Sequence, residues 1–273
     1  MLTSKSLNVK TDGLLVYLTF PLFEKAGVKH AFTTKMGGVS CGDFATFNTG
    51  FDRGDSKENV YENFRILCNA IGINEKNLVF SKQTHTNNVR TVTPDDIGKG
   101  IVKPLDYTDV DGLISNLPGV GLVTQYADCV PLVFYDKKKN IIATSHAGWR
   151  GTVLEIGRKT IEKMQKEFGS DPCDIIAGIG PSIGSCCYEV DDPVVDGFKK
   201  IPYINLSDIL LDKGGGKYML DLKAANKIIL MNSGILENNI DVADLCTCCN
   251  HEYLHSHRYT AGKRGNLGLI VSL

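Results

Sequence analysis

Short apolar runs divide the chain into elements from residue 14 to the C-terminus. Runs rich in apolar and β-branched residues, bounded by Gly, Pro, Asn or Asp, are typical of β-strands. The run at 173–184 ends in a Gly/Pro turn. The pattern predicts strands over residues 14–23, 28–34, 77–85, 87–93, 111–116, 119–128, 130–136, 140–148, 173–184 and 265–273.

Apolar residues spaced three or four positions apart predict helices between these strands. We expect helices over residues 55–73, 151–169 and within 218–235. The first has Asp55 as its N-cap and Glu58 three residues later, which is the pattern of a capping box. The second ends at Gly169, and the third begins after Asp221 and ends near Gly234. The apolar face of the first helix consists of Val60, Phe64, Leu67, Cys68 and Ile71.

The order of the elements indicates the fold class. Helices and strands alternate, but residues 111–148 hold four closely spaced strands, with "DKKK" as a hairpin connection. This order favours mixed β-sheets covered by helices, an α+β fold, over a purely parallel sheet. No internal repeat, low-complexity tract or Pro/Ser-rich linker interrupts the pattern, so we expect a single domain over residues 1–273.

Composition narrows the class of partner. The chain has 273 residues, 42% of them hydrophobic, and a net charge of −1 without a basic run. This balance disfavours nucleic-acid or anionic-membrane binding and favours a small-molecule partner. The apolar run at 14–23 is about half the length of a membrane span, so we expect a cytoplasmic protein. Without a secretion signal, the nine cysteines are expected to be free thiols or metal ligands.

Reactive side chains lie at the ends of two adjacent predicted strands. Cys129 and His146 are symmetric about the "DKKK" turn, so in-register antiparallel pairing places them side by side. His85, at the end of "FSKQTH", is a candidate third group. Two imidazoles and a thiolate can bind zinc and leave a fourth position open. A Cys–His nucleophilic dyad and a buried structural set remain alternatives.

Other segments suggest polar contacts to a substrate. Gly148 and Gly151 allow a sharp entry into a helix whose first amides, with Arg150, can accept an anion. The loop at 33–42 resembles an anion cradle. "CTCCNHEYLHSHR" (246–258) resembles a second metal site, but it lacks two separated Cys pairs, so its spacing disfavours a zinc knuckle. In this last segment, Ser256 and Arg258 are the candidates for substrate contacts.

Eight motifs together resemble one known family. They are "HAFTTKMGGVS", "FNTGFDRGD", "KQTH", "DGLIS", "ADCVPLVF", "SHAGWRGT", "GIGPSIGSCCYEV" and "CTCCN…LHSHR". In this order they resemble the purine nucleoside phosphorylase family, whose members were earlier labelled laccase-domain or multicopper polyphenol oxidase proteins. The resemblance runs from about residue 28 to the C-terminus, and "ADC" with "HAGWRG" is its most specific part.

The resemblance implies a fold, a metal and a reaction. The implied fold is a four-layer α/β/β/α sandwich, and the implied metal is usually zinc, bound by His85, Cys129 and His146. The implied reaction cleaves adenosine, inosine, guanosine and methylthioadenosine with phosphate to a free base and ribose 1-phosphate. Adenosine deamination is an implied side activity. The preferred nucleoside, the group that protonates the leaving base and the oligomeric state stay open.

The chain departs from the family pattern at two places. Lys35 stands where the family usually has Arg, which keeps the charge but loses the bidentate fork for phosphate. Tyr259 and Asn266 also stand at usual Arg positions, and Arg264 is a candidate to compensate for them in space. We expect Lys35, Arg150 and Arg258 to hold the phosphate.

Three alternatives to phosphorolysis come from other classes. A copper polyphenol oxidase of the multicopper type needs more imidazoles than a chain with six His can supply, although a single copper with Met36 as axial ligand is conceivable. The Cys–His dyad would make the protein a hydrolase. The nine cysteines would also suit a non-enzymatic metal-buffering or redox-sensing thiol protein.

Overall fold

A six-stranded mixed sheet forms the N-terminal side of the core. The computed structural model describes residues 2–273. The strand order is β1-β2-β3-β15-β7-β4, and only the β4–β7 pair is parallel. Its strands are β1 (Asn8–Asp12), β2 (Leu15–Thr19), β3 (Lys29–Thr33), β4 (Leu78–Phe80), β7 (Gly121–Tyr126) and β15 (Leu267–Ser272).

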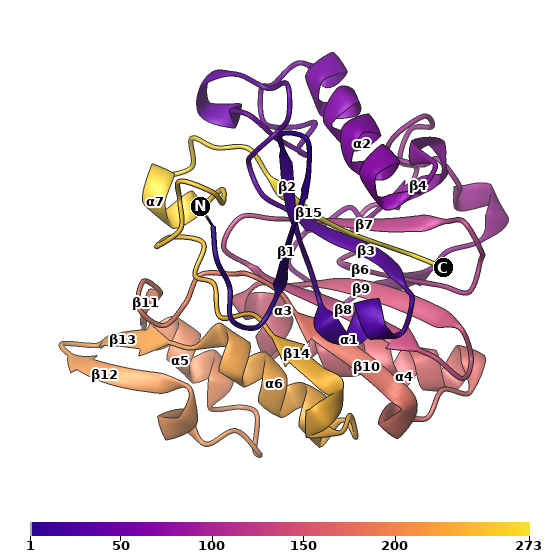
Figure 1. The fold of residues 1–273 in the computed structure, drawn as a ribbon. Helices are drawn as coiled ribbons and strands as arrows, with labels where there is room; N and C mark the ends of the chain where they lie inside the picture. The colour runs from indigo at the N-terminus through magenta and orange to yellow at the C-terminus, as the bar shows by residue number, and fades with distance from the viewer. Residues whose placement is uncertain (1) are drawn as a thin grey trace.

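A second six-stranded mixed sheet packs against the first (Figure 1). Its order is β14-β10-β8-β9-β6-β5, with parallel pairs at both edges and antiparallel pairs between. Its strands are β5 (Val89–Thr91), β6 (Gly112–Ser115), β8 (Val130–Asp136), β9 (Ile141–Ala147), β10 (Ile175–Ile179) and β14 (Ile240–Val242).

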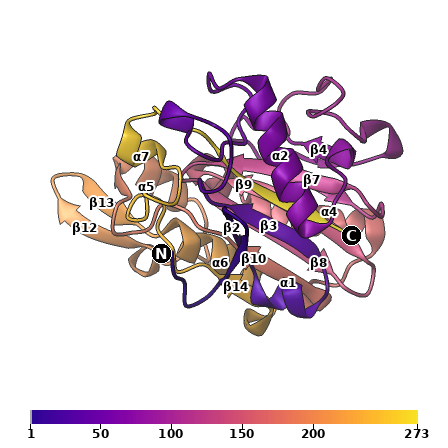
Figure 2. The same ribbon diagram turned by 45° about the horizontal axis from the view of Figure 1, so that its top comes forward.

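Helices cover the outer face of each sheet. Helix α2 lies across the first sheet (Figure 2), and α4 and α6 cover the second. Three apolar clusters separate the resulting four layers: one under α2, one between the sheets and one under α4 and α6. This arrangement confirms the predicted α+β sandwich with mixed sheets. The helices are α1 (Pro21–Lys25), α2 (Lys57–Ile71), α3 (Trp149–Val153), α4 (Ile156–Phe168), α5 (Asp192–Phe198), α6 (Leu222–Asn232) and α7 (His257–Thr260).

Several local boundaries differ from the sequence prediction: the strands predicted at 77–85 and 173–184 are shorter, as β4 and β10, and three other differences have a clear physical cause. The predicted helix at 151–169 is two helices, because Glu155 adopts a left-handed conformation (φ 56°) between α3 and α4. The run at 14–23 changes from strand β2 to helix α1 at Pro21, which pre-sets the first turn of a helix. The N-cap of α2 is Ser56 and not Asp55: the Ser56 hydroxyl accepts from the Asn59 amide at 3.1 Å.

A small third sheet was not predicted from the sequence. It consists of β11 (Glu189–Asp191), β12 (Leu210–Gly214) and β13 (Lys217–Leu220), in the order β11-β13-β12. Strand β12 is mostly exposed, so its residues lack the apolar alternation that marks a half-buried strand.

The chain crosses between the two large sheets at several loops. It passes from β4 to β5 through residues 81–88 and from β7 to β8 through residues 127–129. Because β4 and β7 are parallel, both crossings leave the first sheet at the same edge. Two of the residues predicted to carry chemistry, His85 and Cys129, lie at these crossings.

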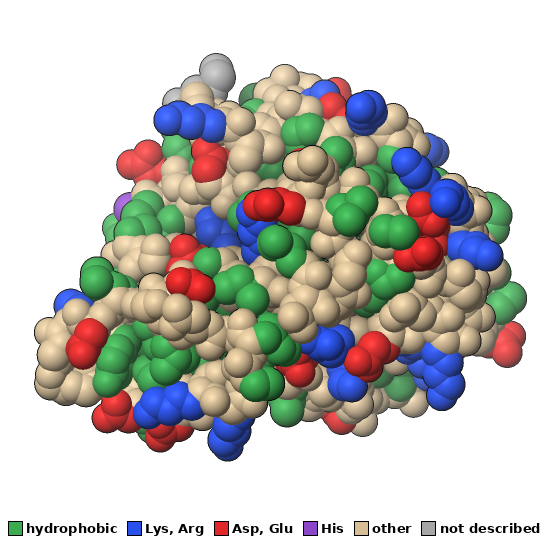
Figure 3. Space-filling model, turned by 90° about the horizontal axis from the view of Figure 1, so that it is seen from below, with side chains coloured by type: hydrophobic (Ala, Val, Ile, Leu, Met, Phe, Trp, Pro, Cys, Tyr) green, Lys and Arg blue, Asp and Glu red, His purple; other side chains and the backbone are tan. Residues whose placement is uncertain are grey.

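Basic and acidic side chains intermingle on the face shown in Figure 3, as a net charge of −1 suggests. Among residues 2–273, no helix has the length and apolar character needed to cross a membrane.

Candidate active site

The three predicted metal ligands converge where the sheets meet. His85 lies in the β4–β5 crossing, Cys129 in the β7–β8 crossing and His146 near the end of β9. One ligand atom from each lies within 4.8 Å of the others, and Cys129 Sγ is 3.9 Å from His85 Nε2. The two imidazole rings meet edge to face, with centroids 4.8 Å apart. Segments up to about 60 residues apart in sequence thus supply one compact donor set.

The hairpin that joins Cys129 to His146 has a different register from the predicted one. His146 pairs with Pro131, and Val130 pairs with Ala147, so Cys129 faces the level of Gly148. A Cβ built on Gly148 would approach Cys129 Sγ to 3.1 Å. The predicted side-by-side pairing of Cys129 with His146 is therefore wrong by two residues. Because side chains repeat every two residues in a strand, both still point to the same face.

Buried Asp111 holds two of the ligands in place. Its Oδ1 lies 2.8 Å from His146 Nδ1, and its carboxylate accepts the backbone N–H groups of Thr84, His85 and Thr86. This contact occupies Nδ1 and leaves Nε2 as the ring nitrogen that faces Cys129 and His85. A carboxylate behind a ligating imidazole is the usual support of a metal-binding histidine. The backbone bonds also hold His85, a non-glycine residue with φ of 67°.

The two histidines favour the thiolate form of Cys129. Desolvation alone would raise the pKa of the thiol, but His146 and His85 outweigh it and lower the pKa to about 6. For His146, desolvation alone would lower the pKa; the Cys129 thiolate and Asp111 instead raise it to about 9. The apo cluster therefore holds a ready thiolate at neutral pH, the form in which cysteine binds metals.

A cavity of about 940 Å³ opens beside this cluster. That volume lies in the range of small-molecule sites. One part of its wall is apolar and aromatic, with the Phe51 and Phe80 ring centroids 6.0 Å apart. Another part is polar: Gln83 is held by bonds to both backbone groups of Gln125, and Lys82 pairs with Asp52. His85, Cys129 and His146 all line the cavity.

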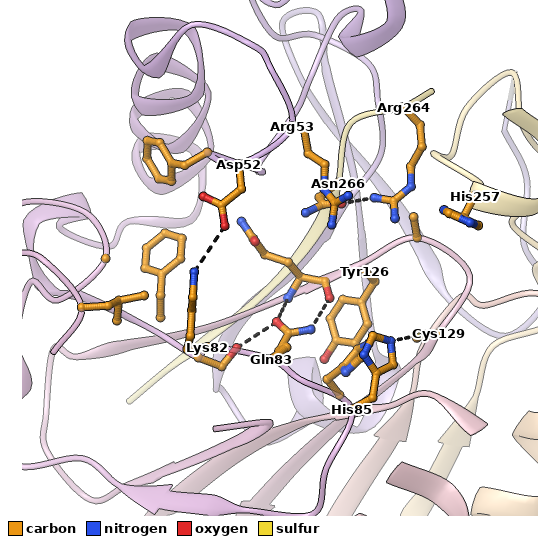
Figure 4. A pocket seen from close by; sticks show the side chains of 18 of the residues that line it. Asp52, Arg53, Lys82, Gln83, His85, Tyr126, Cys129, His257, Arg264 and Asn266 are labelled. Atoms are coloured by element: carbon orange, nitrogen blue, oxygen red, sulfur yellow. Dashed lines mark hydrogen bonds and ion pairs between the residues drawn. The ribbon is translucent and has the colours of Figure 1, made fainter. Parts of the chain in front are cut away.

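Cationic side chains gather at one side of the cavity (Figure 4). Arg264 is buried and bonds Asn266 through Nη1, while its Nε has no hydrogen-bond partner. Burial, together with the nearby charge of Arg53, lowers the pKa of Arg264 to about 10. His257 lies beside it, and the pKa of His257 is lowered by desolvation and by Arg264. Arg53, Arg264 and His257 thus place positive charge at this side of the cavity, where an anion would be favoured.

Of the four residues predicted to contact phosphate or substrate, only Arg258 lines the cavity. Arg258 lines the cavity: its amide donates to Asp128 at 2.7 Å, and its guanidinium donates to two backbone carbonyls. Ser256 is buried and caps helix α7 by accepting from the Tyr259 amide. Lys35 and Arg150 are not among the residues that line the cavity. Arg150 is exposed and stacks on Trp149 at 4.4 Å.

The structure places Arg264, the candidate to compensate for the missing arginines, in the cavity wall. Tyr259, at a position where Arg was expected from the resemblance, is exposed and stacks on His251, with ring centroids 3.4 Å apart. Arg264 and Asn266 both line the cavity. Asn266 provides no charge at the position where the family usually has Arg, and the neighbouring Arg264 provides a positive charge at the same wall.

The donor set fits one metal ion with an open position. Two imidazoles and one thiolate suit zinc, and the cavity lies on the side without a protein ligand. Within residues 2–273, no potential metal group contains more than these two histidines. His30 and His255 are buried and bonded to backbone groups. The described side chains therefore supply no imidazole set for a trinuclear copper cluster.

Several site residues were missed at the sequence level. Asp111 was predicted only as the first residue of the strand at 111–116, and Arg53 lay inside the quoted motif "FNTGFDRGD" without a role. A carboxylate placed directly before a strand that ends beside other reactive groups was the available signal for Asp111. Nothing in the hydrophobic pattern marks Gln83, which lies on an irregular segment, or His257, which begins the four-residue helix α7.

Comparisons with known proteins agree with this geometry. The model of the family described as multi-copper polyphenol oxidoreductase laccase matches residues 29–273, and the chain belongs to this family. "Purine nucleoside phosphorylase YlmD" of Bacillus subtilis (strain 168) is 40% identical over 244 residues, covering 89% of this chain and 87% of that protein. "Adenosine deaminase RL5", from an unidentified prokaryote, is 35% identical over 213 residues, covering 75% and 78%.

A solved structure shows the same fold. The crystal structure of the hypothetical protein YfiH of Bacillus licheniformis superposes with a TM-score of 0.91 at 34% identity, covering 97% of this chain and 98% of that one. The family resemblance drawn from the sequence motifs is confirmed. The named relatives support a nucleoside-processing family.

Proposed function

We propose that the protein is a metal-dependent purine nucleoside phosphorylase. It cleaves adenosine, inosine, guanosine and methylthioadenosine with phosphate to the free base and the corresponding ribose 1-phosphate. The observation that carries this proposal is one cavity bounded by an open three-ligand cluster and by a group of cations. The relatives named purine nucleoside phosphorylase support the same reaction class.

Zinc would be held by His85, Cys129 and His146. When bound, it supplies a Lewis acid at the cavity wall. Asp111 keeps His146 in the tautomer that presents Nε2, and its bonds to the 84–86 backbone hold His85 at the opening. Copper stays a second possible metal for the same donors.

The phosphate is held by the cationic side of the cavity. We assign Arg264 and Arg53 as its main partners, with His257 and Arg258 beside them. The unpartnered Arg264 Nε supports this assignment, because a buried N–H donor needs an acceptor. Ser256 positions Arg258 by capping α7. Lys35, the sequence-level candidate, is half-buried near His255 and would act on the phosphate only through its charge.

Cleavage then requires a phosphate oxygen, the anomeric carbon of the ribose and the base nitrogen to lie in line. A phosphate oxygen forms a bond to the anomeric carbon as the bond from that carbon to the base nitrogen breaks, and the base gains a proton. Positive charge develops on the ribose, so an oriented phosphate anion assists the step. The aromatic wall around Phe51 and Phe80 suits the flat face of a purine.

Adenosine deamination is the second candidate activity. The relative named adenosine deaminase, at 35% identity, favours it. We also propose a reducing compartment such as the cytoplasm, because the motifs place the cysteines as free thiols or metal ligands rather than in a disulfide framework.

Incubation of the purified protein with inosine, with and without phosphate, tests the proposal. We expect hypoxanthine and ribose 1-phosphate in equal amounts, and only when phosphate is present. Equally fast hypoxanthine release in phosphate-free buffer would identify a hydrolase and overturn the proposal. Metal uptake without conversion of any nucleoside would instead support a non-enzymatic thiol protein.

A further inference from the structure

Four cysteines gather outside the cavity. Cys186 and Cys187 come from the loop after β10, and Cys246 and Cys249 come from the segment after β14. Their sulfurs lie within 4.8 Å of one another, and Cys249 Sγ is 3.4 Å from both Cys186 Sγ and Cys187 Sγ. Tetrahedral coordination at about 2.3 Å places sulfurs roughly 3.8 Å apart. The observed spacing suits four sulfurs around one ion.

The backbone turns of the two segments aim the sulfurs inward. The amides of Cys187 and Tyr188 donate to the Gly184 carbonyl, and the Asn250 amide donates to the Cys246 carbonyl at 3.0 Å. The Gly184 amide itself donates to Cys246 Sγ at 3.2 Å. Such a donor stabilises a thiolate rather than a neutral thiol. A Cβ at Gly184 would lie 3.3 Å from Cys186 Sγ, so glycine permits this close approach.

A buried cation compensates for negative charge at the same place. The Lys223 ammonium donates to the Ala243 carbonyl at 2.7 Å and to the Leu245 carbonyl at 3.1 Å. It lies close enough to interact with the charges of Cys246 and Cys186. Four thiolates around a divalent ion leave net negative charge, and buried charge needs a partner. Lys223 provides one.

We infer that Cys186, Cys187, Cys246 and Cys249 form a second metal site that holds a structural zinc ion. Four thiolate ligands leave no position for a substrate, which is the mark of a structural site. Thiolates select zinc over the harder divalent cations, and binding releases the thiol protons. Cys248, in the same "CTCC" run, is not part of the group.

The site would tie together two segments that build the cavity wall. Ile183 and Tyr188 flank the first Cys pair and line the cavity, as does Arg258, beyond the second pair. Arg258 already donates to the Cys187 carbonyl at 3.1 Å. Zinc would therefore hold the loop that Arg258 contacts. The inference stands apart from the proposed function, because its test measures metal binding in protein without the active-site cluster.

Cobalt titration of the Cys129→Ala protein tests the inference. The protein is stripped of metal, reduced and titrated anaerobically with Co²⁺, whose tetrahedral thiolate complexes absorb strongly in the visible range. We expect one cobalt per chain with sulfur-to-cobalt charge-transfer bands, displaced by added zinc. Adding Cys249→Ser should weaken cobalt binding on the order of a hundredfold or more. The Cys41→Ser substitution in the same Cys129→Ala protein, at an exposed thiol elsewhere, should leave the cobalt affinity and the charge-transfer bands unchanged.

Each outcome decides the question. Cys186 and Cys249 are both exposed, so Cys186→Ser serves as a second variant, and circular dichroism checks the fold of each protein. Cys129→Ala protein without thiolate–cobalt bands would overturn the inference. Bands of equal strength in the Cys249→Ser double variant would overturn it too. Protein whose mass before reduction is two hydrogens below that of the fully reduced chain, and which binds no cobalt after reduction, would hold a disulfide there, and this result too would overturn the inference.

Discussion

The two cysteine clusters of this protein differ in one feature that decides their chemistry. The cluster of His85, Cys129 and His146 has three donors and faces a cavity of about 940 Å³. The cluster of Cys186, Cys187, Cys246 and Cys249 has four donors, none of which is among the residues that line that cavity. A metal in the first would keep a position for substrate, and a metal in the second would not. The number of ligands that the fold supplies thus separates a catalytic from a structural role.

Loss of the thiolate from the open cluster should have the largest effect. Cys129→Ala removes one of three ligands, so we expect loss of that metal and of inosine cleavage. Because a catalytic metal contributes several kcal/mol, the rate should fall on the order of a thousandfold. Zinc analysis and hypoxanthine release from the same sample check this. Full metal retention, with the second cluster removed by Cys249→Ser, would contradict the ligand assignment.

Weakening the support of the open cluster should have the next largest effect. In the native protein, the Asp111 carboxylate accepts from the Thr84 amide and contacts His146 Nδ1. Asp111→Asn replaces one carboxylate oxygen with an N–H donor, which cannot accept these hydrogen bonds. We therefore expect metal affinity to fall roughly tenfold to a hundredfold. Asp109→Asn is the matched control, since the half-buried Asp109 accepts from the side chains of Thr84 and Asn88 and does not contact His146. Competition with a zinc chelator measures both. Equal zinc affinity in the two variants would leave Asp111 with a purely structural role.

Thiol reactivity should also distinguish the clusters in metal-free protein. The pKa of Cys129 is lowered to about 6, whereas desolvation and the neighbouring thiols raise that of Cys186 to about 11. Alkylation of Cys129 should therefore rise with pH through about 6 and level off above it. At pH 7.5 it should exceed that of Cys186 roughly tenfold, after allowance for the greater nucleophilicity of the more basic thiolate.

Peptide mass analysis after timed iodoacetamide treatment gives both rates. Buried Cys68, whose pKa is raised to about 12 by burial, serves as an unreactive internal control. Cys186 reacting as fast as Cys129 at pH 7.5 would remove the electrostatic difference between the clusters.

The smallest effect in this series concerns phosphate. A charge-assisted hydrogen bond contributes roughly 1.5–3 kcal/mol, so Arg264→Ala should raise the phosphate KM on the order of tenfold. Metal content should not change. Lys35→Ala should have a smaller effect, because Lys35 is not among the residues that line the cavity. The reverse order of the two variants would restore Lys35 as the phosphate contact predicted from the sequence.

The helices and strands were predicted from the sequence more completely than the contacts between them. Strands β8 and β9 follow from short apolar runs on either side of a polar turn. The prediction that Cys129 and His146 share a face is correct despite a register error of two residues, because the strand repeat is two. The left-handed Glu155 that divides α3 from α4 leaves no mark in the apolar pattern. Strand β12 is exposed, so it also lacks that pattern.

Contacts between distant segments were the harder part. Cys246 and Cys249 alone lack a second separated pair, and that pair comes from Cys186 and Cys187, some 60 residues earlier. Arg264 was named as a candidate, but only the fold places it opposite the metal ligands and beside Arg53. Such sets depend on tertiary contacts that local periodicity does not encode.

Zinc titration of metal-free Cys249→Ser protein, with inosine cleavage followed at each point, tests the central claim most directly. This variant keeps the open cluster and lacks the closed one. The account predicts that activity rises in proportion to bound zinc and saturates at one zinc per chain. Full activity before any zinc is added, or zinc bound to one equivalent without activity, would contradict it.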